Sequence, residues 1–153
     1  MQRITTFLWF DDQAEEAAKF YVSLFKKSRI TGVSGSNGKG KALVVSFRLE
    51  GQDFMALNGG PHFKFTPAIS LFVDCKTQKE VDRLWKKLGE GGKDSQCGWL
   101  QDKYGLSWQI VPTILRKLLG DSDSSKAGRA MEAMMGMGKL DIGALKRAHS
   151  GRN

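Results

Sequence analysis

Residue types that support metal, redox or nucleophilic chemistry are scarce in this sequence. Its 153 residues include only two cysteines, Cys75 and Cys97, which lack the CxxC spacing of a zinc site or redox pair. A disulfide framework is therefore not expected, and both thiols are predicted to be reduced. The only histidines are His62 and His149, so any imidazole-based acid–base mechanism must use one of them. We expect His149 to lie on the surface.

Long apolar segments are missing as well. No stretch approaches the roughly 20 residues that a membrane-spanning helix needs. The N-terminal residues MQRITTFLWFDD reach acidic residues too early for the apolar region of a signal peptide. We therefore expect a cytoplasmic protein with no membrane partner.

Dense runs of basic residues are also absent, although the net charge is +8. The basic pairs are spread along the chain, at Lys26-Lys27, Lys86-Lys87, Arg116-Lys117 and Lys146-Arg147. Nucleic-acid-binding proteins concentrate such residues in one patch or stripe. The scattered charge predicts a solvated basic surface, and nucleic acid is not expected as a partner.

What the sequence does contain predicts one folded domain over residues 1–153. A hydrophobic fraction of 41%, with nine Phe and four Trp, is typical of a packed core. Residues 4–10 are β-branched and aromatic and predict a strand. Apolar spacing over 13–25 predicts an amphipathic helix capped by Asp12. Three strands are then expected at 29–34, 41–49 and 53–57, joined by glycine-rich turns.

The same pattern restarts after Gly59-Gly60-Pro61. The second set is a strand at 68–74, a helix at 78–88, and strands near 92–95, 99–101 and 107–111. Ala17, Phe20, Tyr21 and Leu24 of the first helix correspond to Val81, Leu84, Trp85 and Leu88 of the second, each offset by 64 residues. An internal repeat fixes the architecture. It predicts an α+β fold of two βαβββ modules, 1–60 and 67–112, with a helical tail at 113–153.

The tail has no counterpart in either module. We expect helices at 114–119 and 127–135, and a last short helix capped by Asp141. The second of these helices carries Met131, Met134 and Met135. These methionines form either a flexible lid over a ligand, or ordinary packing or a dimer seam.

One glycine-rich segment imitates a phosphate-binding loop. Residues 35–42 have the glycines and Lys41 of such a loop, but Ala42 stands where a magnesium-binding Ser or Thr belongs. A P-loop must also open a helix, whereas the residues after Lys41 predict a strand. We therefore interpret the segment as a mobile hairpin tip.

Four segments resemble PhnB-like proteins of the vicinal oxygen chelate superfamily, which are often labelled 3-demethylubiquinone-9 3-methyltransferases. They are ITTFLWFDDQAEEAAKFYVSLF, LNGGPHFKFTPAISLFVDC, QCGWLQDKYGLSWQIVP and AMMGMGKLDIGALKRA. The superfamily also includes glyoxalase I, extradiol dioxygenases, and fosfomycin and bleomycin resistance proteins. The resemblance implies that each module forms a curved mixed sheet opening around a cavity, usually in a homodimer.

In metal-using members of that superfamily, His and Glu from the first, fourth, fifth and eighth strands hold a divalent ion. The matching positions here are Thr5 or Thr6, then Met55, Leu57 or Asn58, then Ala68, and finally Gln109. None supplies the imidazole or carboxylate that such an ion prefers. We therefore expect no catalytic metal and no cofactor.

The resemblance also implies that Gln109 lies on the cavity face of the eighth strand. Strand alternation then places Trp108 on the other face, against a helix. Trp99, on the neighbouring strand, is the candidate wall of the pocket, and Gln109 is the polar group that orients a ligand. Three further candidates are Asn58, Cys97 and His62. Cys97 is either an inert apolar residue or a nucleophile, and His62 is either a polar loop residue or a group at the cavity mouth.

The function predicted from these features is metal-independent binding of a small organic molecule in the cavity. The alternative is an enzyme acting on a small organic substrate, of the glyoxalase or dioxygenase type or the methyltransferase that the family label names. Methyl-donor folds bind their cofactor at a glycine-rich turn between a strand and a helix. Neither Asp11-Asp12-Gln13 nor Cys75-Lys76-Thr77 contains a glycine.

Overall fold

Each half of the chain is built around one amphipathic helix on one sheet. In the computed structural model, which describes residues 2–152, the strand β1 (Thr6–Phe10) leads into the helix α1 (Ala14–Leu24). The buried side chains of α1 are Ala14, Ala17, Ala18, Tyr21 and Leu24. They recur at helical spacing, so one face of the helix packs against the sheet.

The remaining elements follow in the order that the repeat predicts. In the first half they are β2 (Arg29–Ser34), β3 (Val44–Leu49) and β4 (Gln52–Asn58). In the second half they are β5 (Ser70–Cys75), α2 (Gln78–Gly89), β6 (Lys93–Asp94), β7 (Trp99–Gln101) and β8 (Ser107–Pro112). The tail contains α3 (Ile114–Leu119), α4 (Ser124–Met135) and α5 (Ile142–Ser150).

The two sheets have equivalent topology. The strand orders are β1-β4-β3-β2 and β5-β8-β7-β6, so the first and last strands of each half are neighbours. The β1–β4 and β5–β8 pairs are parallel, and the other pairs are antiparallel. This confirms the predicted α+β fold with two βαβββ modules and mixed sheets.

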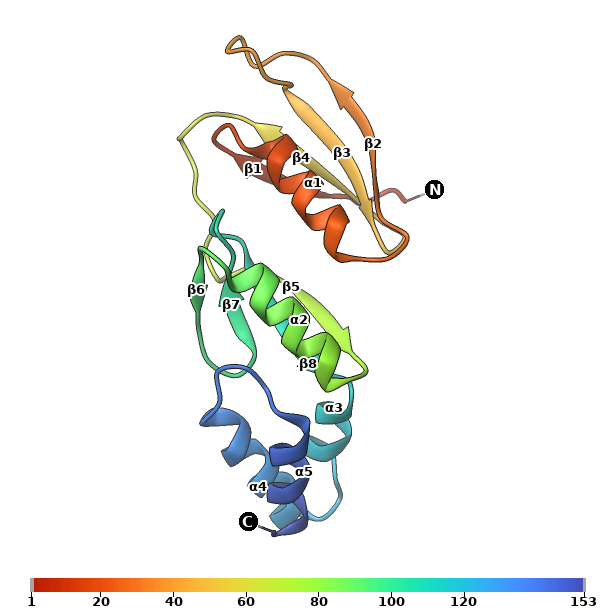
Figure 1. The fold of residues 1–153 in the computed structure, drawn as a ribbon, viewed down its shortest axis with the longest axis vertical. Helices are drawn as coiled ribbons and strands as arrows, with labels where there is room; N and C mark the ends of the chain where they lie inside the picture. The colour runs from red at the N-terminus through yellow and green to blue at the C-terminus, as the bar shows by residue number, and fades with distance from the viewer. Residues whose placement is uncertain (1, 153) are drawn as a thin grey trace. The chain divides into compact units, whose positions relative to one another are not determined.

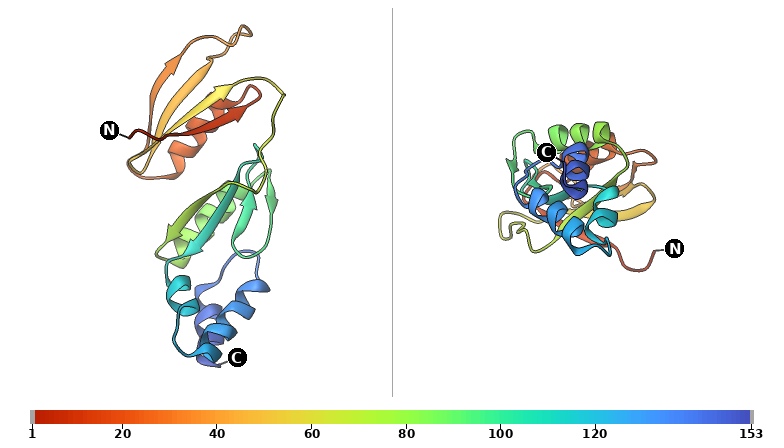
Figure 2. Two further views of the ribbon diagram at one scale, coloured as in Figure 1. Left: turned by 180° about the vertical axis from the view of Figure 1, so that it is seen from behind. Right: turned by 90° about the horizontal axis from the view of Figure 1, so that it is seen from below.

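One helix covers one face of each sheet (Figure 1). α1 lies across the first sheet and α2 across the second, and Val81, Leu84 and Leu88 are the buried residues of α2. Val81 and Leu88 correspond to the buried Ala17 and Leu24 of α1, whereas Phe20, the counterpart of Leu84, is half-buried. The view from behind shows the strands of the second sheet in front of α2, with no helix of the second unit laid across that face (Figure 2). We call this surface the open face of the second sheet.

Two local expectations were wrong. Asp12 does not cap α1: the N–H of Ala14 donates instead to Asn58 Oδ1 at 2.8 Å, and the residue before the helix, Gln13, makes no side-chain cap. The fifth strand begins at Ser70 rather than Ala68, because Thr66 Oγ1 accepts the N–H of Ala68 in a turn. The fifth-strand residue next to Gln109 is therefore Ser70, two positions after the expected Ala68.

The glycine-rich segment at 35–42 forms a hairpin tip, as interpreted, and no helix follows it. Asn37 Oδ1 accepts the N–H groups of Lys39 and Lys41, which closes the loop into a tight turn. Gly38 and Gly40 have φ values of 78° and 83°, a region that favours glycine.

The tail helices pack together at one end of the second sheet. Their core consists of Val111, Leu115, Leu118, Ala130, Leu140 and Leu145. Asp141 caps α5 as predicted, accepting the N–H of Ala144 at 2.9 Å. Met134 packs against this core, whereas Met131 and Met135 are exposed. His149, expected at the surface, is partly buried with 18% of its side chain exposed, and its Nε2 lies 2.8 Å from Asp121 Oδ2.

Contacts divide the chain into two compact units, Met1–Phe65 and Thr66–Asn153. The boundary falls in the segment predicted to link the modules. Within residues 2–152, every helix is too short or too polar to cross a membrane.

Candidate ligand-binding site

Strand alternation in β8 separates core side chains from those of the open face. Trp108 and Ile110 are fully buried on the α2 side of the sheet, which confirms the prediction that Trp108 belongs to the core. Gln109 is half-buried and lies on the opposite face. The register pairs Gln109 with Phe72 of β5 and with Trp99 of β7. The open face therefore carries an aromatic–amide–aromatic row, Phe72–Gln109–Trp99.

The amide of Gln109 is held in place by a neighbour on β5. Its Nε2 donates to Ser70 Oγ at 2.9 Å. Within residues 2–152, no recorded hydrogen bond uses Gln109 Oε1, so that acceptor is available to a ligand. Ser107 Oγ, one row along the same face, is buried and has no hydrogen-bond partner among the described residues. The row thus combines apolar rings with fixed polar atoms that are not yet satisfied.

Asn58 is committed to the fold of the first unit. Its side chain is 4% exposed, with Oδ1 accepting from Ala14 N and Nδ2 donating to Ala42 O at 2.9 Å. One side chain thus forms hydrogen bonds both to the first N–H group of α1 and to the carbonyl group just before β3. Sequence spacing gave no sign of this role, because the partners lie 44 and 16 residues away.

His62 lies with Asn58 at a small polar cavity of about 230 Å³ in the first unit. The cavity is lined by Asp11, Asp12, Asn37, Lys39, Asn58, Gly59, Gly60, Pro61 and His62. Trp9 supports this segment: its indole N–H donates to Gly60 O at 2.9 Å, and its ring meets Phe63 edge-on. A Cβ on Gly59 would lie 2.4 Å from the Trp9 ring, so this position requires glycine.

Cys97 lies against the tail. Its backbone N–H donates to Met137 O at 2.8 Å, and its Sγ is 3.9 Å from Met135 Sδ. The neighbouring Gly98 N–H donates to Gly138 O at 2.9 Å. These contacts fix the loop before β7 to the segment after α4. Of the residues predicted as one site, Asn58 and His62 line the polar cavity of the first unit. Within the second unit, Trp99 and Gln109 lie on the open face and Cys97 lies beside the methionines.

The other thiol, that of Cys75, is buried and unreactive. It is fully buried at the end of β5, and this burial raises its pKa to about 12, with Glu80 and Asp74 adding to the rise. The thiol stays protonated at neutral pH and is not a nucleophile.

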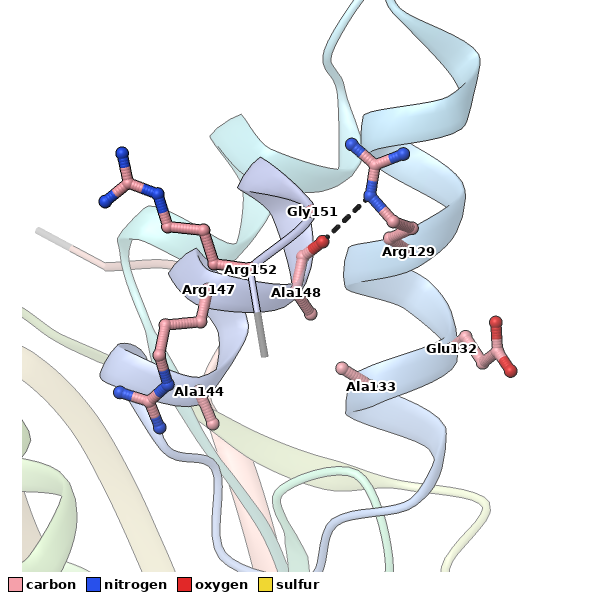
Figure 3. Close-up of a pocket in the computed structure, with 8 residues that line it drawn as sticks. All are labelled: Arg129, Glu132, Ala133, Ala144, Arg147, Ala148, Gly151 and Arg152. Carbon is pink, nitrogen blue, oxygen red and sulfur yellow. Dashed lines mark hydrogen bonds between the residues drawn. The ribbon is translucent and has the colours of Figure 1, made fainter.

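A larger cavity of about 480 Å³ lies between α4 and α5 (Figure 3). Arg129 is fixed at its edge, where Nε donates to Ala148 O at 3.0 Å and Nη2 to His149 O at 2.9 Å. The charged ends of Arg147, Arg152 and Glu132 point away from one another in this view. Because these charges diverge, they do not define a site for one small ion.

The residues at the metal positions do not fit a divalent metal. Gln109 presents an amide and its neighbour Ser70 a hydroxyl, while Thr5 and Met55 stand at the other positions. Such neutral groups are weak ligands for hard or borderline divalent ions. In the described part of the chain, no three His, Cys, Asp or Glu side chains are grouped as a metal site.

This arrangement of two βαβββ modules with mixed sheets defines the fold of the glyoxalase, bleomycin resistance and dioxygenase superfamily. A family model described as 3-demethylubiquinone-9 3-methyltransferase matches residues 2–111. The chain belongs to this family, the PhnB-like branch of the vicinal oxygen chelate fold. No curated protein matched the sequence.

Solved structures agree with this assignment. A PhnB protein from Bacillus cereus is 40% identical with a TM-score of 0.68, over 72% of this chain and 99% of that one. Protein PA1353 from Pseudomonas aeruginosa is 18% identical with a TM-score of 0.60, over 73% and 98%. The fosfomycin resistance protein FosX from Listeria monocytogenes, complexed with Mn(II) and sulfate, is 12% identical with a TM-score of 0.50, over 70% and 88%. The last two show the fold alone.

The methyl donor implied by the family name does not fit the turns where such folds bind it. Asp11–Gln13 connects β1 to α1 without a glycine, and Asn58 already occupies the first N–H of α1. At the start of α2, Thr77 Oγ1 accepts from Glu80 N at 3.2 Å. At both helix starts, a side chain of the protein therefore already accepts an N–H group that a cofactor phosphate or carboxylate would need.

Ser70 and Phe72 are the residues of this site that sequence reasoning missed. The signal was present, because Thr66-Pro67 is a turn sequence that delays the start of the strand. Alternation along β5 places Ser70 and Phe72 on one face, and the register puts that face beside Gln109.

Proposed function

We propose that this protein binds a small planar or amphipathic organic molecule on the open face of the second sheet, without a metal. The observation that carries the proposal is the row Phe72–Gln109–Trp99, in which an anchored amide stands between two rings. Ligand sites typically combine apolar and aromatic walls with a few fixed polar groups.

Three further features support this function. Phe72 is 48% exposed, so its ring is accessible to a partner. The Ser70 hydroxyl fixes the orientation of the Gln109 amide before a ligand arrives, which reduces the entropy lost on binding. Gln109 Oε1 accepts no hydrogen bond within residues 2–152, and a ligand with a donor group can supply one.

The test is a small-molecule library titrated against intrinsic fluorescence. For a ligand that binds, Trp99→Phe and Gln109→Ala should each weaken affinity by roughly tenfold, as expected for a ring contact and a hydrogen bond of about 1.4 kcal/mol. Trp85→Phe, on α2, and Gln52→Ala, on the exposed start of β4, are matched controls and should leave affinity unchanged. Unchanged affinity in both folded site variants would refute the location.

The second candidate function is catalysis on a small organic substrate. It is favoured by the polar cavity of the first unit, where the imidazole of His62 shares one cavity with Asp11 and Asp12. An imidazole and two carboxylates are the groups of acid–base chemistry. If this function holds, His62→Gln should abolish turnover of a substrate and leave binding on the open face intact.

A further inference from the structure

The tail contains a concentration of sulfur atoms that the proposed function does not use. Four of the six methionines in the chain fall within residues 131–137, in the sequence MEAMMGM. The family model matches residues 2–111 and does not extend to this segment. Met131 and Met135 are one helical turn apart on α4 and are both exposed.

The fold brings a thiol to this segment. Cys97 precedes β7, more than thirty residues earlier in the chain, and its Sγ lies 3.9 Å from Met135 Sδ. A thiolate bond to a first-row metal ion is about 2.3 Å, so two sulfurs sharing one ion in a trigonal site stand about 4 Å apart. The observed separation matches that value without any movement of the backbone.

Backbone hydrogen bonds hold the Cys97 loop against the segment that follows α4. Cys97 N–H donates to Met137 O, and Gly98 N–H donates to Gly138 O. Cys97 itself has φ of 59°, an uncommon value for a residue other than glycine. Met135 is 58% exposed, which leaves its thioether open to solvent. The Cys97 loop is therefore fixed against the tail, and the Met135 sulfur is accessible to an ion.

We propose that Cys97 and Met135 bind a soft monovalent metal ion, Cu(I), with Met131 as the third sulfur ligand. Thiolate and thioether ligands select Cu(I) over hard and borderline divalent ions. On binding, the Cys97 thiol releases its proton and forms a sulfur–copper bond, and no electron is transferred. This site is separate from the open face and from the positions at which related folds hold divalent metals.

The test is a titration of the full-length reduced chain with Cu(I), under anaerobic conditions, in competition with the coloured chelator bicinchoninate. The wild type should withdraw about one equivalent of Cu(I) from the chelator. Met135→Leu preserves the bulk of the side chain and removes the sulfur. It should weaken Cu(I) binding at least about tenfold, because loss of a residue that only supports a metal ligand already weakens binding by about that factor. Cys97→Ser should abolish binding.

Two controls separate this site from general thiol or thioether affinity. Met55→Leu, in the first unit, should leave Cu(I) binding unchanged. Bound Cu(I) should also protect Cys97 from alkylation by iodoacetamide, with the alkylated residue identified by peptide mass. Wild-type affinity in Met135→Leu, or retention of the bound ion by Cys97→Ser, would overturn the proposal.

Discussion

The indole N–H of Trp108 donates a hydrogen bond to Asp102 Oδ2 at 2.9 Å, and both side chains are buried. Asp102 Oδ1 also accepts the N–H groups of Tyr104 and Leu106, at 2.9 and 3.0 Å. One carboxylate therefore shapes the turn between β7 and β8 and fixes the core face of β8. The position of Gln109 on the open face depends on that register.

Substitutions at this pair should lower stability. Trp108→Phe removes the donor and should cost about 1–2 kcal/mol, whereas Asp102→Ala leaves three donors without an acceptor and should cost roughly 3 kcal/mol. Urea unfolding followed by circular dichroism measures both. Asp94→Ala, on the exposed strand β6, should change little. An Asp102→Ala variant as stable as the wild type would show that the carboxylate does not organise the turn.

Asn58 should matter for stability more than its position at a strand end suggests. Asn58→Ala leaves the N–H of Ala14 and the carbonyl of Ala42 unsatisfied, and should lower the free energy of unfolding by about 2 kcal/mol. Asn58→Asp keeps the acceptor for α1 and should be intermediate. Equal stability of the two variants would mean that the cap contributes nothing.

The two thiols should differ in reactivity. Iodoacetamide should modify Cys97 in the native protein, and Cys75 only after unfolding, since Cys75 has no exposed surface. The pKa of Cys75 is raised from 9.0 to about 12, mainly by burial. The unfolded thiol ionises first as pH rises, so this contribution to stability is complete below pH 9 and is lost between pH 9 and 12. Cys75→Ala should remove that part of the alkaline destabilisation.

Divalent metals should not bind stoichiometrically at the open face. After dialysis against zinc, nickel, manganese or iron(II), elemental analysis should find well under one ion per chain, because Gln109 and Ser70 are neutral ligands. A stoichiometric ion that disappears in Gln109→Ala would contradict this expectation.

We also expect a homodimer, as the family resemblance implies. Its seam should involve sheet edges or the exposed methionines Met131 and Met135, since both kinds of surface favour a partner. Sedimentation at micromolar concentration measures the mass directly. A monomer across that range would refute the expectation.

The repeat made most of the fold predictable. Ala17 and Leu24 of α1 are buried, as are Val81 and Leu88 of α2 64 residues later, and the sheet orders correspond, because an amphipathic pattern determines which face of an element packs. Strands 29–34 and 99–101 and helix 114–119 agree with β2, β7 and α3 to the residue. Here, local pattern and tertiary packing favour the same structure.

The missed features depend on partners distant in sequence. Asp12 and Asn58 are both suitable capping residues, and only the closure of the sheet brings Asn58 to α1. The surroundings of Cys97 could not be predicted, because they are formed by tail residues about 40 positions later in the chain. The early start predicted for the fifth strand differs, because the Thr66-Pro67 turn that delays it is a local signal.

Val111 belongs to two structures at once. It is a residue of β8, which pairs with β5, and a member of the tail core with Leu115 and Leu118. Thr113 N–H also bonds to Cys75 O at 2.8 Å, tying the start of the tail to the end of β5. The tail and the second sheet should therefore melt as one cooperative unit. Amide protons of β8 should exchange faster with solvent in a chain shortened at Pro112, even though every strand of that sheet remains.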